Sequence, residues 1–238
     1  MPRTMLNDQH WSKLLSIFRH FNIYLKSNLR HFIEAILFRI RTGCPWRDLP
    51  EEFGKHNSIF KKYNRWSKNY KLMNILKLFS KYVDKEWIFI DGSHVRAHQH
   101  SAGIKNQDIS KSIGGNSSKI HLAIDSDGNP IEFIISDGTS HDIKIAPELV
   151  SQLDLTDSEI LCADKGYDSD SFRSQIEATK TKPNIPRKSN TKSNNEHMDW
   201  YIYKIRHLVE NTFCRLKQFR GIATRYDKLK VTIKVLSL

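Results

Sequence analysis

Residues 87–98 read WIFIDGSHVRAH, and this stretch decides the fold of the chain. Its first four residues are aromatic or β-branched, a pattern that predicts a buried strand. Helical patterns precede it and strand patterns follow it. The sequence therefore predicts an all-α N-terminal domain over residues 1–86 and an α/β domain over residues 87–238.

Downstream of that strand, residues 119–138 (KIHLAIDSDGNPIEFIISDG) predict two strands joined by a turn at Asp127 and Gly128. Asp-Gly between apolar runs is a strong hairpin signal. The later patterns predict a helix, a buried strand and a second helix at residues 141–153, 159–164 and 169–180. This order describes a mixed sheet flanked by helices.

Upstream, residues 8–21 and 28–43 show apolar periodicity of about 3.6 residues, which predicts two helices. Two further short helices about a turn at Gly54 would make a helix-turn-helix-like unit. Tyr63 and Trp66 are interleaved with basic residues on its second helix: Lys61, Lys62, Arg65 and Lys68. The alternative is a helical bundle with a solvated basic face.

The charge of the chain is unevenly distributed. The formal net charge is +12, and residues 1–86 hold 17 Lys and Arg against 7 Asp and Glu. A polyanion would be attracted to this region, so nucleic acid is the first candidate partner. An anionic membrane would fit the charge alone, but no basic segment with a clean apolar face is present.

Several protein classes are disfavoured by the rest of the composition. The sequence has no apolar run of membrane-spanning length, and its first residues lack the apolar core of a signal peptide. Cys44, Cys162 and Cys214 are scattered, which favours buried thiols in a reducing compartment over a zinc site or a disulfide. We therefore expect a cytoplasmic protein with no membrane partner.

Four polar residues near the C-terminus fall on one stripe of a predicted helix: Tyr203, Arg206, Glu210 and Lys217. At about 100° per residue they lie within roughly 60° of arc, with apolar residues on the opposite side. We call these four residues the polar stripe. Arg206 and Glu210 alone could be an ordinary surface ion pair four residues apart.

Two aspartates occupy equivalent places in the α/β region. Asp91 and Asp164 each follow a short apolar run, and a glycine comes one or two residues later. Open α/β sheets place their ligands at such strand ends. With Glu210 they would supply hard oxygen donors that suit Mg²⁺ or Mn²⁺, and two such ions can promote displacement at phosphorus.

Each acidic residue also has an ordinary interpretation. An aspartate at a strand end is often a turn-former or a helix cap. Asp125 is explained by the hairpin turn, and three other aspartates are explained as helix-start residues: Asp142, Asp168 and Asp170. The combination of Asp91, Asp164 and Glu210 with the polar stripe is what favours a catalytic role.

These residues carry a family resemblance over about residues 5–230. The chain resembles the DDE transposases of bacterial insertion sequences, specifically the insertion-sequence-five group. The matching segments are IDGSHVRAHQHSAG, GGNSSKIHLAIDSDGNPIEF, ADKGYDSD, the stripe Y-x2-R-x3-E-x6-K and the N-terminal CPWRDLPEEFGKHNSIFKKYNRWSK.

The resemblance implies a ribonuclease-H-like catalytic domain in which Asp91, Asp164 and Glu210 hold two Mg²⁺ (or Mn²⁺) ions. It also implies that the other stripe residues position the transposon-end backbone. The N-terminal helical domain would recognise the terminal inverted repeats of double-stranded DNA. The partners implied are those repeats, target DNA and a second copy of the chain in a synaptic complex, in a nucleoid-associated protein.

The function implied is metal-dependent DNA cleavage at insertion-sequence ends followed by strand transfer into target DNA. A stand-alone two-metal nuclease and a non-catalytic, decayed DNA-binding remnant are the alternatives. Family members continue beyond the R-Y-x-K-L region, which Arg225 begins here, whereas this sequence stops after KVTIKVLSL. We therefore expect a truncated C-terminal tail.

Other candidates have weaker support. Lys119 and Lys165 are predicted phosphate contacts, while Arg187 and Lys188 either line a DNA path or belong to a solvated loop. Three histidines share parity along an extended segment: His94, His98 and His100. They could bind zinc, but a DNA-facing or active-site-lining role is favoured.

Overall fold

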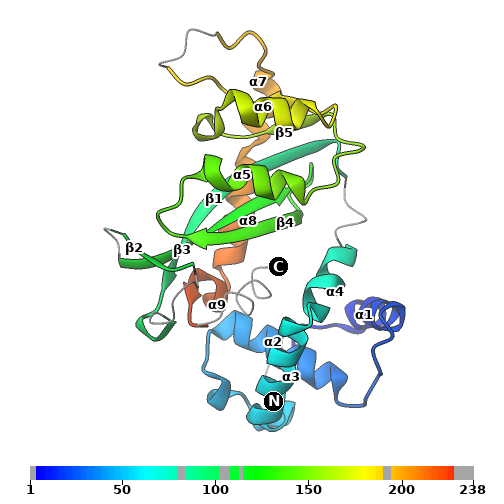
Figure 1. Ribbon diagram of the computed structural model, residues 1–238. Helices are drawn as coiled ribbons and strands as arrows, with labels where there is room; N and C mark the ends of the chain where they lie inside the picture. The colour runs from blue at the N-terminus through cyan, green and yellow to red at the C-terminus, as the bar shows by residue number, and fades with distance from the viewer. Residues whose placement is uncertain (1–3, 80–83, 102–107, 113–114, 190–193, 228–238) are drawn as a thin grey trace.

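The computed structural model describes residues 4–79, 84–101, 108–112, 115–189 and 194–227. Helices at the N-terminus form one part of the molecule, and a sheet with helices on both faces forms the other (Figure 1). The C-terminal residues 228–238, where a truncated tail is expected, lie outside the described residues.

The N-terminal part is helical, as its apolar periodicity predicts. Its α-helices are α1 (Asp8–His20), α2 (Leu29–Thr42), α3 (His56–Lys68) and α4 (Lys71–Phe79). The Asn7 side chain caps α1 by accepting a hydrogen bond from the His10 backbone N–H at 2.7 Å. Gly43 ends α2 with a φ of 69°, a left-handed conformation that favours glycine.

The segment before Gly54 differs from the expected short helix. It contains two single 3-10 turns, η1 (Trp46–Asp48) and η2 (Glu51–Phe53), which follow Pro45 and Pro50. Proline lacks a backbone N–H and restricts the residue before it, so two prolines five residues apart prevent a continuous α-helix here.

A mixed sheet is the centre of the second part. Its strands are β1 (Trp87–Ala97), β2 (Ser110–Ser112), β3 (Gly115–Ile124), β4 (Pro130–Asp137), β5 (Ile160–Cys162), β6 (Lys182–Asn184) and β7 (Thr224–Arg225). β3 is antiparallel to β1, β2 and β4, whereas β5 is parallel to β1 and β6. The strands run in the order β2-β3-β1-β5-β6, with β4 also paired to β3 and β7 also paired to β1. The fold is therefore α/β, with a mixed sheet flanked by helices, as the order of sequence patterns predicts.

The predicted hairpin between β3 and β4 is present. Gly128 in its turn has a φ of 82°. The Asp125 carboxylate accepts hydrogen bonds from the backbone N–H groups of Asp127 at 3.0 Å and Asn129 at 2.6 Å. Asp125 thus stabilises the turn, as the sequence indicates.

Helices cover both faces of the sheet, and side chains of β1 alternate between these two faces. Ile88 and Ile90 pack in a buried cluster with α5 (Asp142–Ser151) and α6 (Asp170–Glu177). Phe89 packs in the other cluster with α8 (His207–Lys217). Asp91 follows Phe89 by two residues, so the strand directs it to the α8 face.

The final amphipathic helix is interrupted once. It divides into α7 (Trp200–Ile205) and α8, and Arg206 lies between them with φ −50° and ψ −22°. These angles are helical, so the interruption leaves Arg206 on the same side as Glu210. The residues of the polar stripe therefore stay on one side of α7 and α8, although the helix is not continuous.

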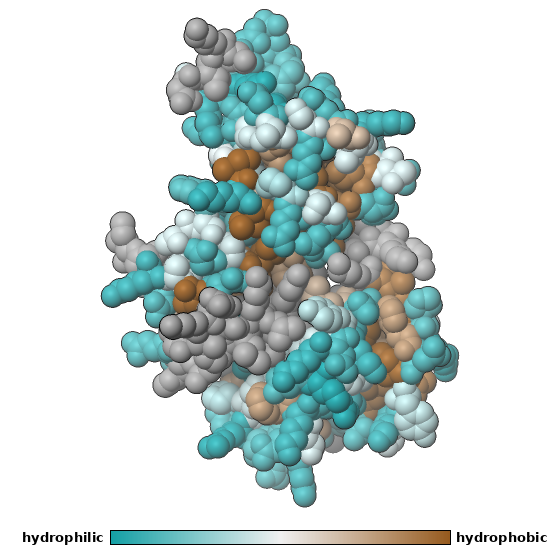
Figure 2. All heavy atoms as spheres, viewed as in Figure 1, coloured by the Kyte–Doolittle hydropathy of each residue, from teal (hydrophilic) through white to brown (hydrophobic). Residues whose placement is uncertain are grey.

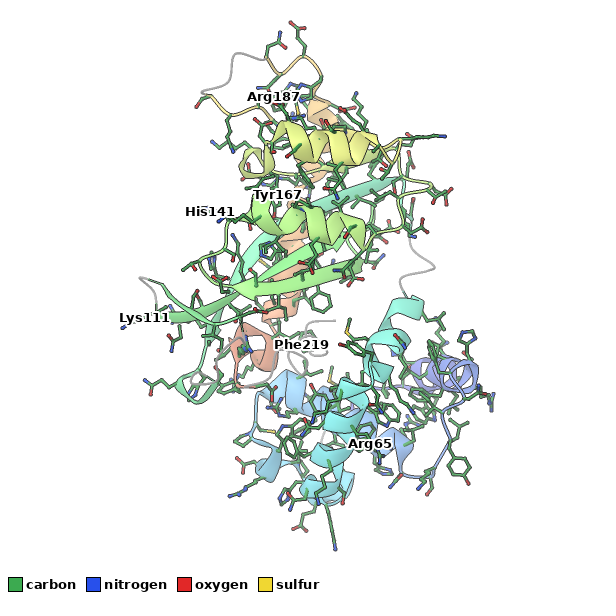
Figure 3. All side chains as sticks on the ribbon, in the orientation of Figure 1. Arg65, Lys111, His141, Tyr167, Arg187 and Phe219 are labelled. Carbon is green, nitrogen blue, oxygen red and sulfur yellow. The ribbon has the colours of Figure 1, made fainter. Side chains whose placement is uncertain are left out.

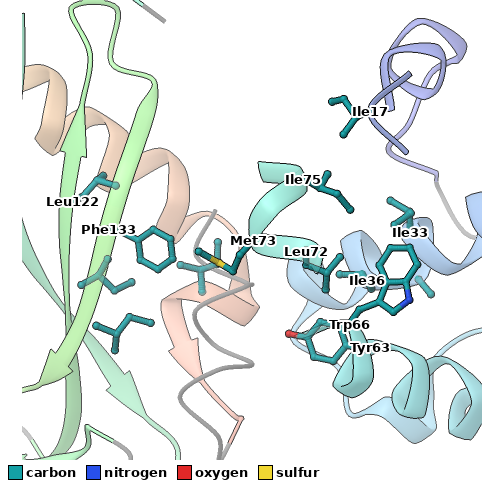
Figure 4. Packing of buried hydrophobic residues seen from close by; sticks show 14 of the residues in the cluster. Ile17, Ile33, Ile36, Tyr63, Trp66, Leu72, Met73, Ile75, Leu122 and Phe133 are labelled. Carbon is teal, nitrogen blue, oxygen red and sulfur yellow. The ribbon is translucent and has the colours of Figure 1, made fainter. Parts of the chain in front are cut away.

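The two parts of the molecule share a hydrophobic core. Met73 of α4 belongs to the same buried cluster as Phe133 of β4, and Figure 4 shows this packing. Gly221, in α9 (Arg220–Ala223), lies against α2, where a Cβ atom would come within 2.9 Å of the Ile40 carbonyl oxygen. An ion pair of 3.0 Å joins Arg39 to Asp227.

The visible surface is mostly hydrophilic, with apolar side chains gathered over α5 and beside α1 and α4 (Figure 2). Within the described residues, every helix falls short of the length and apolar character that crossing a membrane requires.

Candidate active site

Asp91 and Asp164 lie at matching positions on neighbouring strands. The parallel pairing of β1 with β5 ends where Phe89 faces Cys162. Each aspartate comes two residues after that pair, so both point to the same face, where adjacent strands are about 4.8 Å apart. The register brings Asp91 and Asp164 to the same region of the fold, close enough for the Asp164 charge to raise the pKa of Asp91, after burial, the main cause.

The position of Asp91 within its strand differs from the sequence prediction. Asp91 does not end β1, which continues to Ala97 because its antiparallel pairing with β3 persists to Arg96 and Ser117. It is β5 that ends, at Cys162, so β5 does not pair with β1 beside Asp91. The Asp91 side chain is 22% exposed.

Arg206 joins Asp91 to the polar stripe. Its Nη1 donates to Asp91 Oδ2 at 3.1 Å, and its Nη2 donates to Glu210 Oε1 at 2.9 Å. The Gly92 backbone N–H also donates to Asp91 Oδ1 at 2.7 Å. Only 17% of the Arg206 side chain is exposed, compared with 56% for Glu210. We call Asp91, Asp164, Glu210 and Arg206 the acidic centre.

The electrostatics of the acidic centre show an excess of negative charge. Burial raises the pKa of Asp91, and the nearby Asp142 and Asp164 raise it further, against the opposing effects of the Gly92 N–H and Arg206. The pKa of Arg206 is raised too, because Asp91 and its other neighbours outweigh the effect of its burial. A further cation would therefore stabilise these carboxylates.

The donor chemistry of the acidic centre fits Mg²⁺ or Mn²⁺. Asp91, Asp164 and Glu210 offer hard carboxylate oxygens, which these ions prefer. Within the part of the chain that the structure describes, no three acidic, histidine or cysteine side chains are grouped closely enough to hold an ion. Arg206 lies between Asp91 and Glu210 and supplies the positive charge there.

The remaining stripe residues lie beside the acidic centre. The Tyr203 ring is 5.8 Å from the Arg206 guanidinium carbon, and burial raises the pKa of Tyr203. Lys217 Nζ donates to Ser93 Oγ at 2.6 Å. The polar stripe therefore runs along β1, with contacts at Asp91 and Ser93.

Lys119 lies on the opposite face from Asp91. It is 8% exposed, and its Nζ is 2.6 Å from Asp142 Oδ1. Gly92 makes room for this pair, because a Cβ atom there would come within 2.5 Å of that oxygen. Lys165, the other predicted phosphate contact in this region, is exposed in η5 (Lys165–Tyr167).

Asp142 was not foreseen as a site residue. It is the first residue of α5, as its helix-start interpretation predicts, but its carboxylate also lies 3.3 Å from His121 Nδ1. Burial opposes ionisation, yet contacts with His121 and Lys119 lower the pKa of Asp142. The cluster forms because the start of α5 packs against β3, which the sequence does not indicate.

The basic residues of α3 differ in their exposure to solvent. Lys61, Arg65 and Lys68 are exposed, and Figure 3 shows Arg65 on the helical part of the molecule. Lys62 lies over the Phe32 ring at 4.2 Å, and burial, then the nearby Arg65 and Lys26, lower its pKa.

Both aromatic residues interleaved with the α3 cations belong to the core. Tyr63 is 0% exposed and Trp66 is 5% exposed. The exposed basic surface of α3 therefore consists of charged side chains without these rings.

Asp168 is the centre of a second acidic cluster. Arg173 Nη2 donates to its Oδ1 at 2.9 Å, and the Lys188 backbone N–H donates to its Oδ2 at 2.9 Å. Arg187 Nη1 pairs with Asp170 at 2.6 Å and with Asp168 at 3.4 Å. We call Asp168, Arg173, Arg187 and Lys188 the Asp168 network. Arg187 belongs to this paired structure, at the far end of the molecule from Arg65 (Figure 3).

Asp168 lies next to the N-cap of α6, as its helix-start interpretation predicts, but its side chain has a different role. α6 begins at Asp170 and its N-cap is Ser169, so Asp168 lies outside the helix. Its side chain is 3% exposed, and its role is to bind the arginine and backbone donors around it.

The histidines and cysteines are dispersed. His94 Nε2 is 3.0 Å from the Gly138 carbonyl oxygen, whereas the His98 ring packs against Tyr226 with ring centroids 5.1 Å apart. The His100 side chain lies outside the described residues. All three cysteines are free, with Cys162 buried and Cys214 exposed, and burial raises the pKa of Cys162 to about 12.

The protein is a mixed α/β protein in which Asp91 on the sheet contacts Arg206, the residue that joins α7 to α8. Residues 83–236 match the family described as Transposase DDE domain, and residues 6–76 match one described as Putative transposase of IS4/5 family. The first match covers more than half of the sequence, so the chain belongs to the DDE transposase family. The resemblance stated from the motifs is confirmed.

Two curated proteins are similar over part of the chain. Uncharacterized protein y4sN of Sinorhizobium fredii is 40% identical over 80 residues, which are 34% of this chain and 64% of that protein. A putative transposase for insertion sequence element IS6501 of Brucella ovis is 36% identical over 111 residues, 46% of this chain and 83% of that protein. This chain thus covers less than two thirds of the first relative.

Solved structures give more distant likenesses. "Crystal structure of a pre-cleavage Mos1 transpososome" matches 98% of this chain and 84% of that chain with a TM-score of 0.33 and 8% identity. "Mos1 transposase paired-end complex with left transposon end" matches 92% and 89% with a TM-score of 0.31 and 8% identity. These scores are too low to support an argument about this chain.

Proposed function

We propose that this chain is a transposase that cuts DNA at the ends of an insertion sequence and joins the 3′-hydroxyl groups to target DNA. The contact from Arg206 to both Asp91 and Glu210 is the main support, because it unites residues 115 and 4 positions apart in sequence. Membership of the DDE transposase family agrees with this activity.

The three carboxylates have the central role in the proposal. Asp91, Asp164 and Glu210 would hold two Mg²⁺ or Mn²⁺ ions, which supply Lewis-acid activation and charge stabilisation during displacement at phosphorus. Asp91 lies within β1, Asp164 follows the neighbouring β5 by two residues, and Glu210 lies on α8, whose residues pack with Phe89 of β1. The sheet thereby limits the movement of Asp91, one of the three proposed donors.

DNA would meet the protein on two surfaces. At the acidic centre, Arg206 can bind a phosphate through two parallel hydrogen bonds, and Lys217 adds a point charge. On α3, Lys61, Arg65 and Lys68 would bind the backbone of the terminal repeat and release its counterions. Two DNA ends would be held by a homodimer.

A cleavage assay on labelled terminal-repeat DNA tests this function. Wild-type protein with Mg²⁺ should nick the element end and, with target plasmid, form joined products. Asp164→Asn should bind the same DNA in a gel shift and leave it intact. Hydrolysis without joined products would identify a nuclease, and binding without nicking by the wild type would identify a DNA-binding remnant.

A further inference from the structure

Arg206 contacts two carboxylates that are proposed to hold metal ions, Asp91 and Glu210. One guanidinium bridges Asp91 Oδ2 at 3.1 Å and Glu210 Oε1 at 2.9 Å, and these two carboxylates are proposed metal ligands. A carboxylate has about four lone-pair sites, but a metal ion on these oxygens would lie close to the positively charged guanidinium and be repelled by it. Arg206 and a divalent cation therefore compete for this position.

The competition has an electrostatic basis as well. Arg206 partly offsets the negative charge that Asp91, Asp164 and Glu210 bring together. A second and third positive charge entering the same space would repel the guanidinium, since like charges a few ångströms apart in a partly buried site interact strongly. Binding of cations is thus favoured when Arg206 has another anionic partner.

Such a partner exists in the proposed function. A DNA phosphate offers Arg206 two oxygens in the same fork-like geometry as a carboxylate. Arg206 stands at the junction of α7 and α8, with Glu210 more than half exposed on its outer side. Rotation about its side-chain bonds could turn the guanidinium outward while the helix stays in place.

We infer that Arg206 is an internal counter-ion that DNA removes. Without DNA it holds Asp91 and Glu210 and weakens cation binding; when the DNA end arrives, its guanidinium transfers to a phosphate and leaves both carboxylates to the cation. This inference rests on the proposed function. It makes metal binding and DNA binding mutually reinforcing, and by linkage each raises the affinity of the other by the same factor.

The exchange would also restrict catalysis to the correct substrate. A protein that binds its cations weakly in the absence of the DNA end has little capacity to cut other DNA that only touches its basic surfaces. The regulating contact is a single side chain, so its removal should separate cation binding from DNA binding.

Titration with Mn²⁺ tests the inference directly. Binding to the full chain is measured by calorimetry without DNA, then with an uncleaved terminal-repeat duplex. We expect Arg206→Gln to bind Mn²⁺ about tenfold more tightly than the wild type without DNA, within the usual range of coupling between sites. DNA should tighten Mn²⁺ binding by a similar factor in the wild type and by little in Arg206→Gln.

Two further variants complete the experiment. Lys204→Gln removes an exposed positive charge from the same helical segment without touching the carboxylates, and it should behave as the wild type. Arg206→Lys retains the charge and should keep part of the effect of DNA. Thermal unfolding of each variant verifies its fold, and Arg206→Lys serves if Arg206→Gln does not fold.

The outcomes separate the inference from the function. Arg206→Gln with unchanged or weaker Mn²⁺ affinity, or an equal response to DNA in the variant and the wild type, would overturn the role of Arg206 alone. A wild type that cleaves DNA ends with DNA-independent Mn²⁺ affinity would do the same. A wild type that binds no Mn²⁺ in either condition would overturn the proposed function together with the inference.

Discussion

Asp91 and Asp168 are acidic residues near arginines, but their surroundings are opposite: 22% of the Asp91 side chain is exposed, compared with 3% of the Asp168 side chain. Asp168 accepts two hydrogen bonds from Arg173 and one from the Lys188 backbone, and these donors outweigh burial and lower its pKa. Asp91 receives one from Arg206 and one from its neighbour Gly92, and burial raises its pKa.

The difference is the one expected between a structural carboxylate and a carboxylate of the proposed active site. In the Asp168 network the donors inside the protein satisfy the charge, so nothing further is needed. In the acidic centre several carboxylates depend largely on one guanidinium, so a ligand with positive charge gains free energy by binding. Perturbed acidic groups of the second kind are typical of functional sites.

The largest effect should come from Asp91→Asn on DNA cleavage. Loss of one charged metal ligand should lower the cleavage rate by about 1000-fold or more, equivalent to roughly 4 kcal/mol of transition-state stabilisation. Single-turnover cleavage of terminal-repeat DNA measures the rate. Gel-shift affinity should stay near that of the wild type, and cleavage within tenfold of the wild type would exclude Asp91 from catalysis.

The next largest effect should be on the free energy of unfolding and should come from substitution of Asp168. Asp168→Ala leaves Arg173 buried without its carboxylate partner, so the free energy of unfolding should fall by about 3 kcal/mol. Urea denaturation measures this change. The double variant Asp168→Ala/Arg173→Met should recover part of the loss, because it removes the unpaired charge; no recovery would contradict this explanation.

A smaller effect concerns the pH dependence of stability. The folded-state pKa of Asp168 is lowered, so its stabilising contribution is present above the ordinary aspartate pKa of about 3.9 and is lost as pH falls through the lowered value. The raised pKa of Asp91 has the opposite sign: its ionisation costs stability as pH rises from about 3.9 through the raised value.

Urea denaturation between pH 3 and pH 7 can test these opposite pH dependences of stability. At pH 7, Asp91→Asn should be more stable than the wild type, because burial raises the pKa of Asp91, and this advantage should disappear as pH falls toward 4. Asp168→Asn should be less stable at pH 7, with the difference narrowing only below about pH 4. The same pH trend in both variants would remove the distinction between the two sites.

The smallest effect should come from Arg187→Gln. Arg187 pairs mainly with Asp170, whose side chain is 88% exposed, and exposed ion pairs contribute at most about 1 kcal/mol. We expect unfolding free energy to change by roughly 0.5 kcal/mol or less. A loss comparable to that of Asp168→Ala would show that Arg187 is essential to the Asp168 network.

Much of the fold could be predicted from sequence because its signals are local. Apolar periodicity located α1 and α2, and the Asp-Gly dipeptide located the hairpin turn after Asp125. The stripe spacing placed Arg206 and Glu210 on one face, since helical angles at Arg206 preserve the periodicity even between α7 and α8.

The sequence by itself determined the class of fold, the family and the residues from which an active site could be built. Tertiary structure alone decided which partners those residues have: Arg206 between Asp91 and Glu210, Lys119 with Asp142, and Asp168 outside its helix. Periodicity is a property of neighbouring residues, whereas these contacts depend on strand register and helix packing between segments distant along the chain.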